Sequence, residues 1–250
     1  MALRTAGGGG GGGPGALFGG AGASFTRQLS YLTLACSIAA GIATYWMELG
    51  DVVVSLFGMT PIALVGGGPM LPYVPALWQL VSYPFFVLEP VALVLGVIVY
   101  GWWAGDLERQ WGRALFVERW LTLVIGVASA HALFAIAFPV LREHTLFGPT
   151  ALLEGLVVAW GLTFPTRTVR MWLVLPITGQ MLAWITGGLV VLSALFGGPM
   201  GALLAIPAIT SVALAVAMVR WDFSMRRFWL LYQRQRIQRE LDRIRRDDLH

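Results

Sequence analysis

The stretch HTLFGPTALLEGLVVAWG, residues 144–161, decides how the rest of the chain is interpreted. It is a short apolar segment whose start, Gly148 followed by Pro149, is typical of a helix N-terminus, because the first turn does not use the N–H that proline lacks. Thr150 and Glu154 are four residues apart and therefore share one face of the helix. Burial of a carboxylate in an apolar helix is costly, so Glu154 marks a candidate functional position.

The chain around this segment is too apolar for a soluble domain. Its 250 residues are 57% hydrophobic and 12% charged, with a mean hydropathy of +0.73, whereas soluble domains carry about 25% charged residues. A helix needs about 20 apolar residues to span a bilayer. We therefore predict an all-α polytopic membrane protein with six transmembrane helices and a short fourth helix. The expected spans are 31–54, 85–104, 119–140, 148–164, 171–196 and 199–219.

The arginines predict the orientation. All 17 basic residues are arginines, and all but Arg142 fall before the first span, after the second, after the fourth or after the sixth. With six spans these four regions lie on one side of the membrane, and the positive-inside rule makes that side cytoplasmic for both termini. Arginine bias and the absence of a signal-peptide pattern favour a bacterial plasma membrane.

The two ends of the chain differ from its middle. Residues 1–28 contain the run Gly7–Gly13 and are expected to form a disordered cytoplasmic N-terminus. Residues 29–220 form the predicted membrane domain, in which Pro207 predicts a kink. Residues 221–250 are basic with a loose apolar stripe, which predicts an amphipathic cytoplasmic helix near anionic lipid headgroups.

Five segments, in this order, resemble the rhomboid superfamily of intramembrane serine proteases. They are WQLVSYPF (78–85), AGDLERQWGRALF (104–116), GPTALLEG (148–155), FPTRTVRMWLVLPI (164–177) and GALLA (201–205). The likeness extends over residues 28–220, and its strength lies in the order and spacing of the motifs. It implies a six-helix bundle with a short, central fourth helix and a lateral opening toward lipid. The positions that match the family's structural motifs are Trp78, Glu108, Arg109, Gly112, Gly148, Gly155 and Gly201.

The family's chemistry requires a serine nucleophile, a histidine base on the sixth helix and oxyanion donors on the second. The nucleophile position carries Thr150, whose extra methyl group restricts its rotamer. The base position falls at Pro199 or Gly198, and the donor positions fall at Ala92 and Gly96. None of these four side chains can take the required role. The resemblance therefore implies a pseudoprotease that binds or handles transmembrane segments of client proteins.

Two alternatives remain open from the sequence. Thr150, Glu154, His131 and His144 form a candidate polar site, and a divergent protease that uses Thr150 would need one of these histidines as its base. A membrane scaffold or transport subunit would instead place Glu89 and Glu154 on a continuous aqueous path.

The sequence predicts few other partners. It has no Cys/His pattern for a metal, no phosphate-binding loop and no nucleic-acid-binding fold, so we expect no metal and no cofactor. The expected partners are the lipid bilayer and transmembrane clients, with no oligomeric state assigned.

Overall fold

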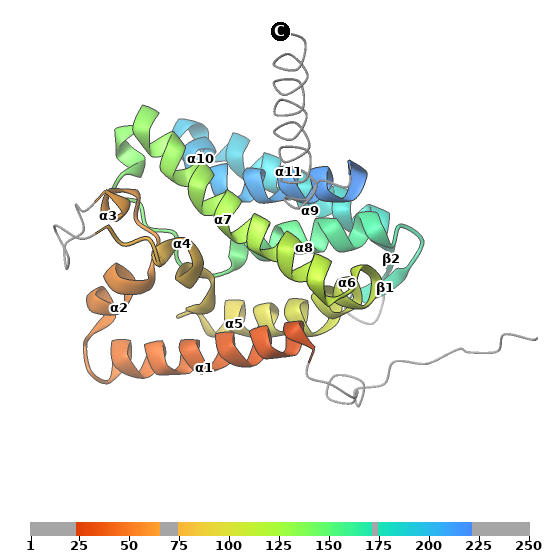
Figure 1. Cartoon of the computed structure of the whole chain (residues 1–250). Helices are drawn as coiled ribbons and strands as arrows, with labels where there is room; N and C mark the ends of the chain where they lie inside the picture. Colours follow the sequence, from red (N-terminus) through yellow and green to blue (C-terminus); the bar gives the residue numbers. More distant parts are fainter. Residues whose placement is uncertain (1–23, 66–74, 172–174, 222–250) are drawn as a thin grey trace, which may run out of the picture.

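The computed structural model describes residues 24–65, 75–171 and 175–221, and this part of the chain is predominantly helical (Figure 1). A π-helical turn over Val99–Ala104 joins α5 to α6, and single 3-10 turns cover Tyr83–Phe85 and Pro139–Leu141. The helices are α1 (Phe25–Tyr45), α2 (Gly50–Phe57), α3 (Pro61–Leu64), α4 (Gln79–Ser82), α5 (Pro90–Ile98), α6 (Gly105–Trp111), α7 (Arg113–Ala137), α8 (Thr150–Thr163), α9 (Gly179–Phe196), α10 (Gly198–Leu204) and α11 (Ile206–Arg220).

The prediction of a helical membrane protein is confirmed. Three helical segments are long and apolar enough to cross a membrane, namely Pro90–Trp111, α7 and α9. The pair α10 and α11 adds a fourth if the two are one span bent by 50°. The break falls at Ala205, and Pro207 lies in the first turn of α11, so the predicted kink is confirmed. The remaining predicted spans correspond to α8, which has only 14 residues, and to α1.

The predicted first span, 31–54, has the wrong bounds. Helix α1 begins at Phe25, inside the segment expected to be a disordered tail, and ends at Tyr45. The chain then turns through Glu48, whose φ of 56° lies in the left-handed region, and starts the separate helix α2 at Gly50. The apolar residues of α2 had suggested one continuous span, but a left-handed residue ends an α-helix.

The predicted fifth span, 171–196, begins too early, and the all-α class is not strictly correct. An antiparallel hairpin of β1 (Thr168–Met171) and β2 (Leu175–Thr178) precedes α9, with Thr168 paired to Thr178. Helix α9 begins only after Thr178, whose hydroxyl caps its first turn by accepting from the Met181 N–H. Pro176 lies within the apolar run that suggested a helix, and proline disfavours a helix in the residues before it.

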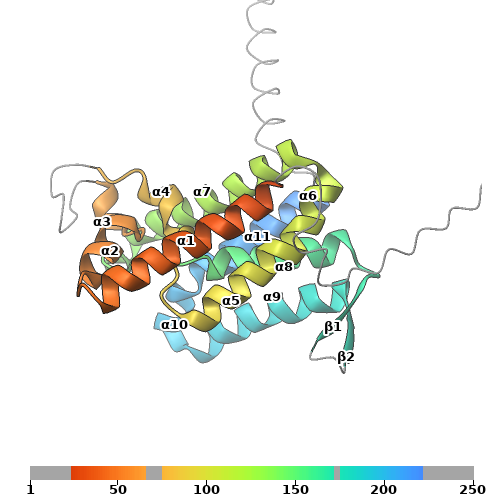
Figure 2. The same ribbon diagram turned by 90° about the horizontal axis from the view of Figure 1, so that it is seen from below.

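Helix α8 occupies the centre of the bundle (Figure 2), and nearly its whole length is buried. It packs against α5, α7, α9 and α11, and two of its glycines permit the closest of these contacts. A Cβ atom on Gly155 would lie 2.2 Å from the Ser211 hydroxyl of α11. A Cβ atom on Gly161 would lie 2.3 Å from the Gly179 carbonyl oxygen at the start of α9. Small residues at such positions allow helices in membranes to approach closely.

Helix α1 has an inverted pattern of polarity. Its buried face carries hydroxyl groups, while its exposed face carries large apolar side chains. The buried polar residues are Thr26, Ser30, Thr33 and Ser37, and the exposed apolar residues are Tyr31, Leu32, Leu34, Ile38 and Ile42. In water the apolar face would be the buried one. The arrangement is therefore the opposite of that expected for a helix on the surface of a soluble domain.

The two ends of the bundle differ in composition. We call one the loop end, where α2, α3 and α4 lie and where an isolated β-bridge joins Met59 to Leu146. We call the other the charged end. There Asp106 pairs with Arg109 and Arg167 and accepts a hydrogen bond from the Trp160 indole N–H at 3.1 Å.

Gly112, between α6 and α7 at the charged end, has a φ of +80° and a ψ of 151°, a conformation in which other residues are strained. A Cβ atom there would meet no atom within 4 Å. Substitution by alanine is therefore expected to act through the backbone alone and to lower the free energy of unfolding by about 1–2 kcal/mol. Thermal unfolding in detergent measures this effect. The control is Gly41→Ala in α1, which also meets open space but has no positive φ; equal losses in both variants would contradict the prediction.

Candidate functional site

A cavity of about 360 Å³ lies at the loop end, above the start of α8. We call it the α8 cavity. Three of the four residues of the predicted polar site line it, and one of the lining residues, Tyr83, comes from the turn that follows α4. The lining residues are Tyr83, Val127, His144, Thr145, Leu146, Phe147, Gly148, Thr150, Ala151, Glu154, Leu204, Pro207 and Ala208.

The backbone turns into α8 at Gly148. Its φ of +89° lies in the left-handed region, and its N–H donates to the Tyr83 carbonyl at 3.0 Å. Pro149 follows as the N-cap residue. This turn presents Thr150, the first residue of the helix, to the cavity, where it is exposed. In the described part of the chain no side chain forms a hydrogen bond with the Thr150 hydroxyl.

Glu154 lies one turn further along α8 and also lines the cavity. Its Oε2 atom is shut off from solvent and has no hydrogen-bond partner among the described residues. An ionised carboxylate removed from water without a partner is strongly disfavoured. One oxygen of the Glu154 carboxyl group is therefore an unsatisfied polar atom beside an accessible space.

The two histidines contact each other, but only one lines the cavity. The His131 ring is fully buried on α7, and its Nε2–H donates to the His144 carbonyl oxygen at 3.2 Å. The two imidazoles lie edge to face with their centroids 5.4 Å apart. His131 therefore holds the loop before α8, while His144 reaches the cavity. Burial lowers the pKa of His144 below its ordinary value of 6.5, which keeps this imidazole neutral at pH 7.

The residues that the sixth predicted span contributes differ from those expected. Pro199, the position at which a base was sought, is in the first turn of α10 and does not line the cavity. Leu204, Pro207 and Ala208 line it instead, because the bend at Ala205 turns this part of the chain toward α8. None of these three side chains accepts a proton.

The positions predicted for the oxyanion donors lie on α5. Gly96 is buried, and a Cβ atom there would lie 3.7 Å from Leu153 and 3.9 Å from Pro149. The structure therefore brings Gly96 close to the start of α8. Ala92 lies one turn before Gly96 on the same helix. Neither residue lines the α8 cavity as described, and neither carries a side-chain donor.

The loop end is held by polar side chains, one of which, Gln79, was not among the candidate residues from the sequence. The Gln79 amide donates to the Ser55 carbonyl at 2.8 Å and accepts from the Thr60 N–H at 3.2 Å, and it is almost fully buried. The Trp78 indole N–H donates to the Leu56 carbonyl at 2.8 Å. The signal for Gln79 was its position, since it is a large polar residue in a mostly apolar segment.

The remaining motif positions are structural. Glu108 accepts hydrogen bonds from the first residues of α1, and Arg109 is exposed and paired with Asp106. Gly155 packs on α11, and Gly201 lies in α10 with Ser193 as its nearest contact.

A second cavity of about 390 Å³ adjoins the first at the loop end. Thr145 lines both cavities, and the second also contains the carboxylates Asp51 and Glu143. The Thr145 hydroxyl is hydrogen-bonded to that of Thr60 at 2.8 Å. Within the described residues, no group of three or more His, Cys, Asp or Glu side chains is placed to hold a metal ion.

Comparison of the chain with protein-family models, with curated proteins and with solved structures found no match in any of the three.

Proposed function

We propose that this chain is a rhomboid-like integral membrane protein without proteolytic activity, which binds transmembrane segments of other proteins. The observation that carries the proposal is the environment of Thr150. Its hydroxyl lies in an open cavity, no base among the described residues is hydrogen-bonded to it, and the sixth predicted span contributes only apolar side chains there. An alcohol needs an adjacent base to become a nucleophile.

We also infer six membrane crossings, made by α1, Pro90–Trp111, α7, α8, α9 and the bent pair α10 and α11. The lipid-facing apolar surface of α1 supports its inclusion. Helix α8 extends about 21 Å, which is shorter than the hydrocarbon core of about 30 Å. Its start therefore lies within the depth of the bilayer, and the α8 cavity occupies the space above it.

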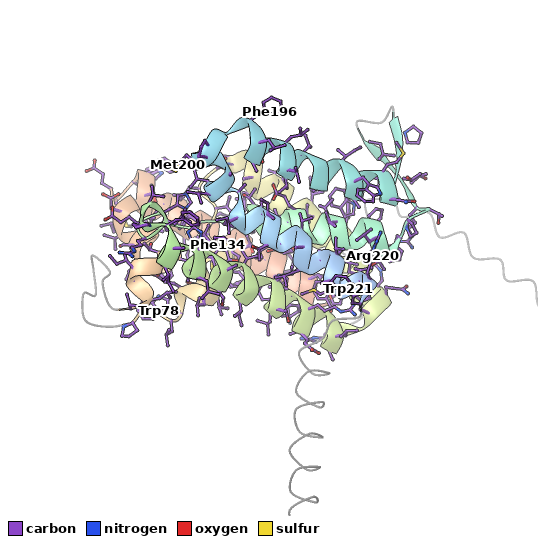
Figure 3. The ribbon with its side chains drawn as sticks, turned by 90° about the horizontal axis from the view of Figure 1, so that it is seen from above. Trp78, Phe134, Phe196, Met200, Arg220 and Trp221 are labelled. Carbon is purple, nitrogen blue, oxygen red and sulfur yellow. The ribbon has the colours of Figure 1, made fainter. Side chains whose placement is uncertain are left out.

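The charge distribution supports cytoplasmic termini. The described arginines of α6, α7 and α11 lie at the charged end, where Arg220 and the neighbouring Trp221 are exposed (Figure 3). The exposed apolar side chains of Phe134, Phe196 and Met200 lie elsewhere on the bundle. Arginine at one end and Trp at the same level are typical of a cytoplasmic membrane boundary.

The exposed apolar surfaces of α5 and α9 support entry of a transmembrane segment from lipid. Helix α5 packs on α1 and α8, and α9 packs on α8, α10 and α11. Both helices also carry strongly exposed apolar residues, including Val91 and Val94 on α5 and Trp184 and Leu189 on α9. A client helix that enters from lipid between α5 and α9 would meet the start of α8. Segments with polar or helix-breaking residues are the clients that fit a site containing Thr150 and Glu154.

Site-specific photocrosslinking tests the binding activity. A photoreactive amino acid at position 150 is expected to crosslink a single-span reporter segment that contains a Gly-Pro pair, in membranes that hold the full chain. The matched control is the same amino acid at Ile209, which is exposed on α11 and does not line the cavity. Equal crosslinking from both positions would show random encounter in the bilayer and would overturn the binding proposal.

A second candidate, a divergent intramembrane protease, is favoured by one observation, that His144 and Thr150 line the same cavity. We expect a fluorophosphonate probe to leave the purified protein unlabelled and a reporter segment to stay intact. Thr150→Ser is expected to be equally inactive, because the missing base rather than the methyl group is limiting. Labelling or cleavage that disappears in Thr150→Ala would establish the protease instead.

A further inference from the structure

We propose that the α8 cavity binds an ammonium or guanidinium group, with Glu154 as the counter-charge. The cation has two possible sources of the same chemistry, a basic side chain within a bound transmembrane segment or a small free amine. The first source rests on the proposed function, and the second does not.

The carboxyl group of Glu154 has no counter-charge within the described protein. Its Oε2 atom is unpartnered, and no described arginine lines the cavity. Arg142, which lies in the loop before α8, is exposed and donates through Nε to the Ala135 carbonyl at 3.3 Å. A carboxylate at membrane depth is strongly stabilised by a cation that forms a hydrogen-bonded pair with it.

The other lining groups suit a cation with an apolar stem. The Thr150 hydroxyl and the neutral His144 imidazole can each accept a hydrogen bond from an N–H. Leu146 and Phe147 provide an apolar wall for the methylene groups of such a side chain. The Tyr83 hydroxyl donates its hydrogen to the Val124 carbonyl at 3.2 Å, so toward a cation this group can act only as an acceptor.

The approach to the cavity is also acidic. Asp51 and Glu143 line the adjoining cavity, which meets the first at Thr145. Glu48 is exposed near the same end of the bundle, where Arg142 is the described arginine. Carboxylates along the walls of a cleft raise the local concentration of cations and repel anions.

Peptide crosslinking and ligand binding test the two sources separately. The probes would be single-span Leu–Ala peptides that contain a photoreactive residue and one test residue, which is Lys, Arg or norleucine. The test residue would lie a quarter of the peptide's length from the terminus on the same side of the membrane as the loop end. Three proteins would be compared as full chains in nanodiscs, namely wild type, Glu154→Gln and Glu89→Gln. Glu89→Gln is the control, because it removes an exposed carboxylate that does not line the cavity. Benzylamine and benzyl alcohol would be compared in parallel by their effect on Tm.

We expect Lys and Arg peptides to crosslink to wild type and Glu89→Gln about tenfold more than norleucine peptides, and to lose this advantage in Glu154→Gln, since a charge-assisted hydrogen bond is replaced by a neutral one. If all peptides crosslink equally in every variant, client binding stands and the cation site is refuted. If no peptide crosslinks but benzylamine raises Tm only when Glu154 is present, the cation site stands and client binding falls. If neither the basic peptides nor benzylamine depends on Glu154, the inference is wrong.

Discussion

Gly161→Ala is expected to lower the free energy of unfolding by about 3 kcal/mol, the upper part of the range for overpacked interiors. The added methyl group would lie 2.3 Å from the Gly179 carbonyl oxygen and 2.9 Å from the Ala183 Cβ atom. Both obstacles belong to α9, and one is backbone, so no side-chain rotation relieves the contact. The helices α8 and α9 must separate, and the most buried helix of the bundle loses packing along its length.

Thermal unfolding in detergent is expected to show this loss as a fall in Tm of roughly 6–12 °C. Gly188→Ala is the matched control, because it places the same methyl group on α9 where no atom lies within 4 Å. Its Tm is expected to stay constant or rise slightly, since alanine favours a helix more than glycine does. A similar fall in both variants would show that helix propensity or detergent, rather than the contact between α8 and α9, sets the stability.

Glu108→Ala is expected to cause a loss of about 2–4 kcal/mol, because several hydrogen bonds to one buried charged group are removed together. The Glu108 carboxylate accepts from the Phe25 N–H at 2.8 Å, from the Thr26 N–H at 2.9 Å and from the Thr26 hydroxyl at 2.8 Å. These backbone groups belong to the first turn of α1, whose N–H groups have no partner within the helix. Negative charge at a helix N-terminus is also stabilised by the helix dipole.

The loss is expected to appear in two measurements, a lower Tm and faster amide hydrogen exchange at the start of α1. Glu108→Gln separates the causes, since its amide can still accept one or two of the hydrogen bonds without charge, and an intermediate loss is expected. Glu89→Gln, which removes an exposed carboxylate, controls for net charge. Unchanged exchange at Phe25 and Thr26 in Glu108→Ala would contradict the capping role.

Local features of the sequence predicted much of the fold. The fourth segment was expected over 148–164 and is observed as Thr150–Thr163. Its start was predictable because Gly148 favours a turn and Pro149 favours the beginning of a helix. Helix α7 extends back to Arg113 rather than 119, since hydropathy marks the part of a helix that lies in lipid and not the polar turns beyond it. The hairpin before α9 was missed, because an apolar run of this length fits a strand or a helix equally well.

The site was predicted only in part. Thr150, Glu154 and His144 share a cavity as expected, because two are one turn apart on a helix and the third is in the loop that leads into it. Pro199 lies in α10 outside the cavity, and His131 holds the loop before α8 instead of lining the cavity. Both outcomes depend on how α7, α10 and α11 pack, which sequence spacing along any single helix does not contain.

The sequence by itself predicted that this protein lies in a membrane and that its arginines gather on one side. Both predictions rest on the free energy of transferring individual residues between water and lipid, which depends on local sequence. Only the tertiary structure showed which side chains face the start of α8. It also showed that Glu108 caps α1 and that Gly161 allows α9 to pack closely against α8. These contacts join segments far apart in the chain, and their geometry follows from close packing of whole helices.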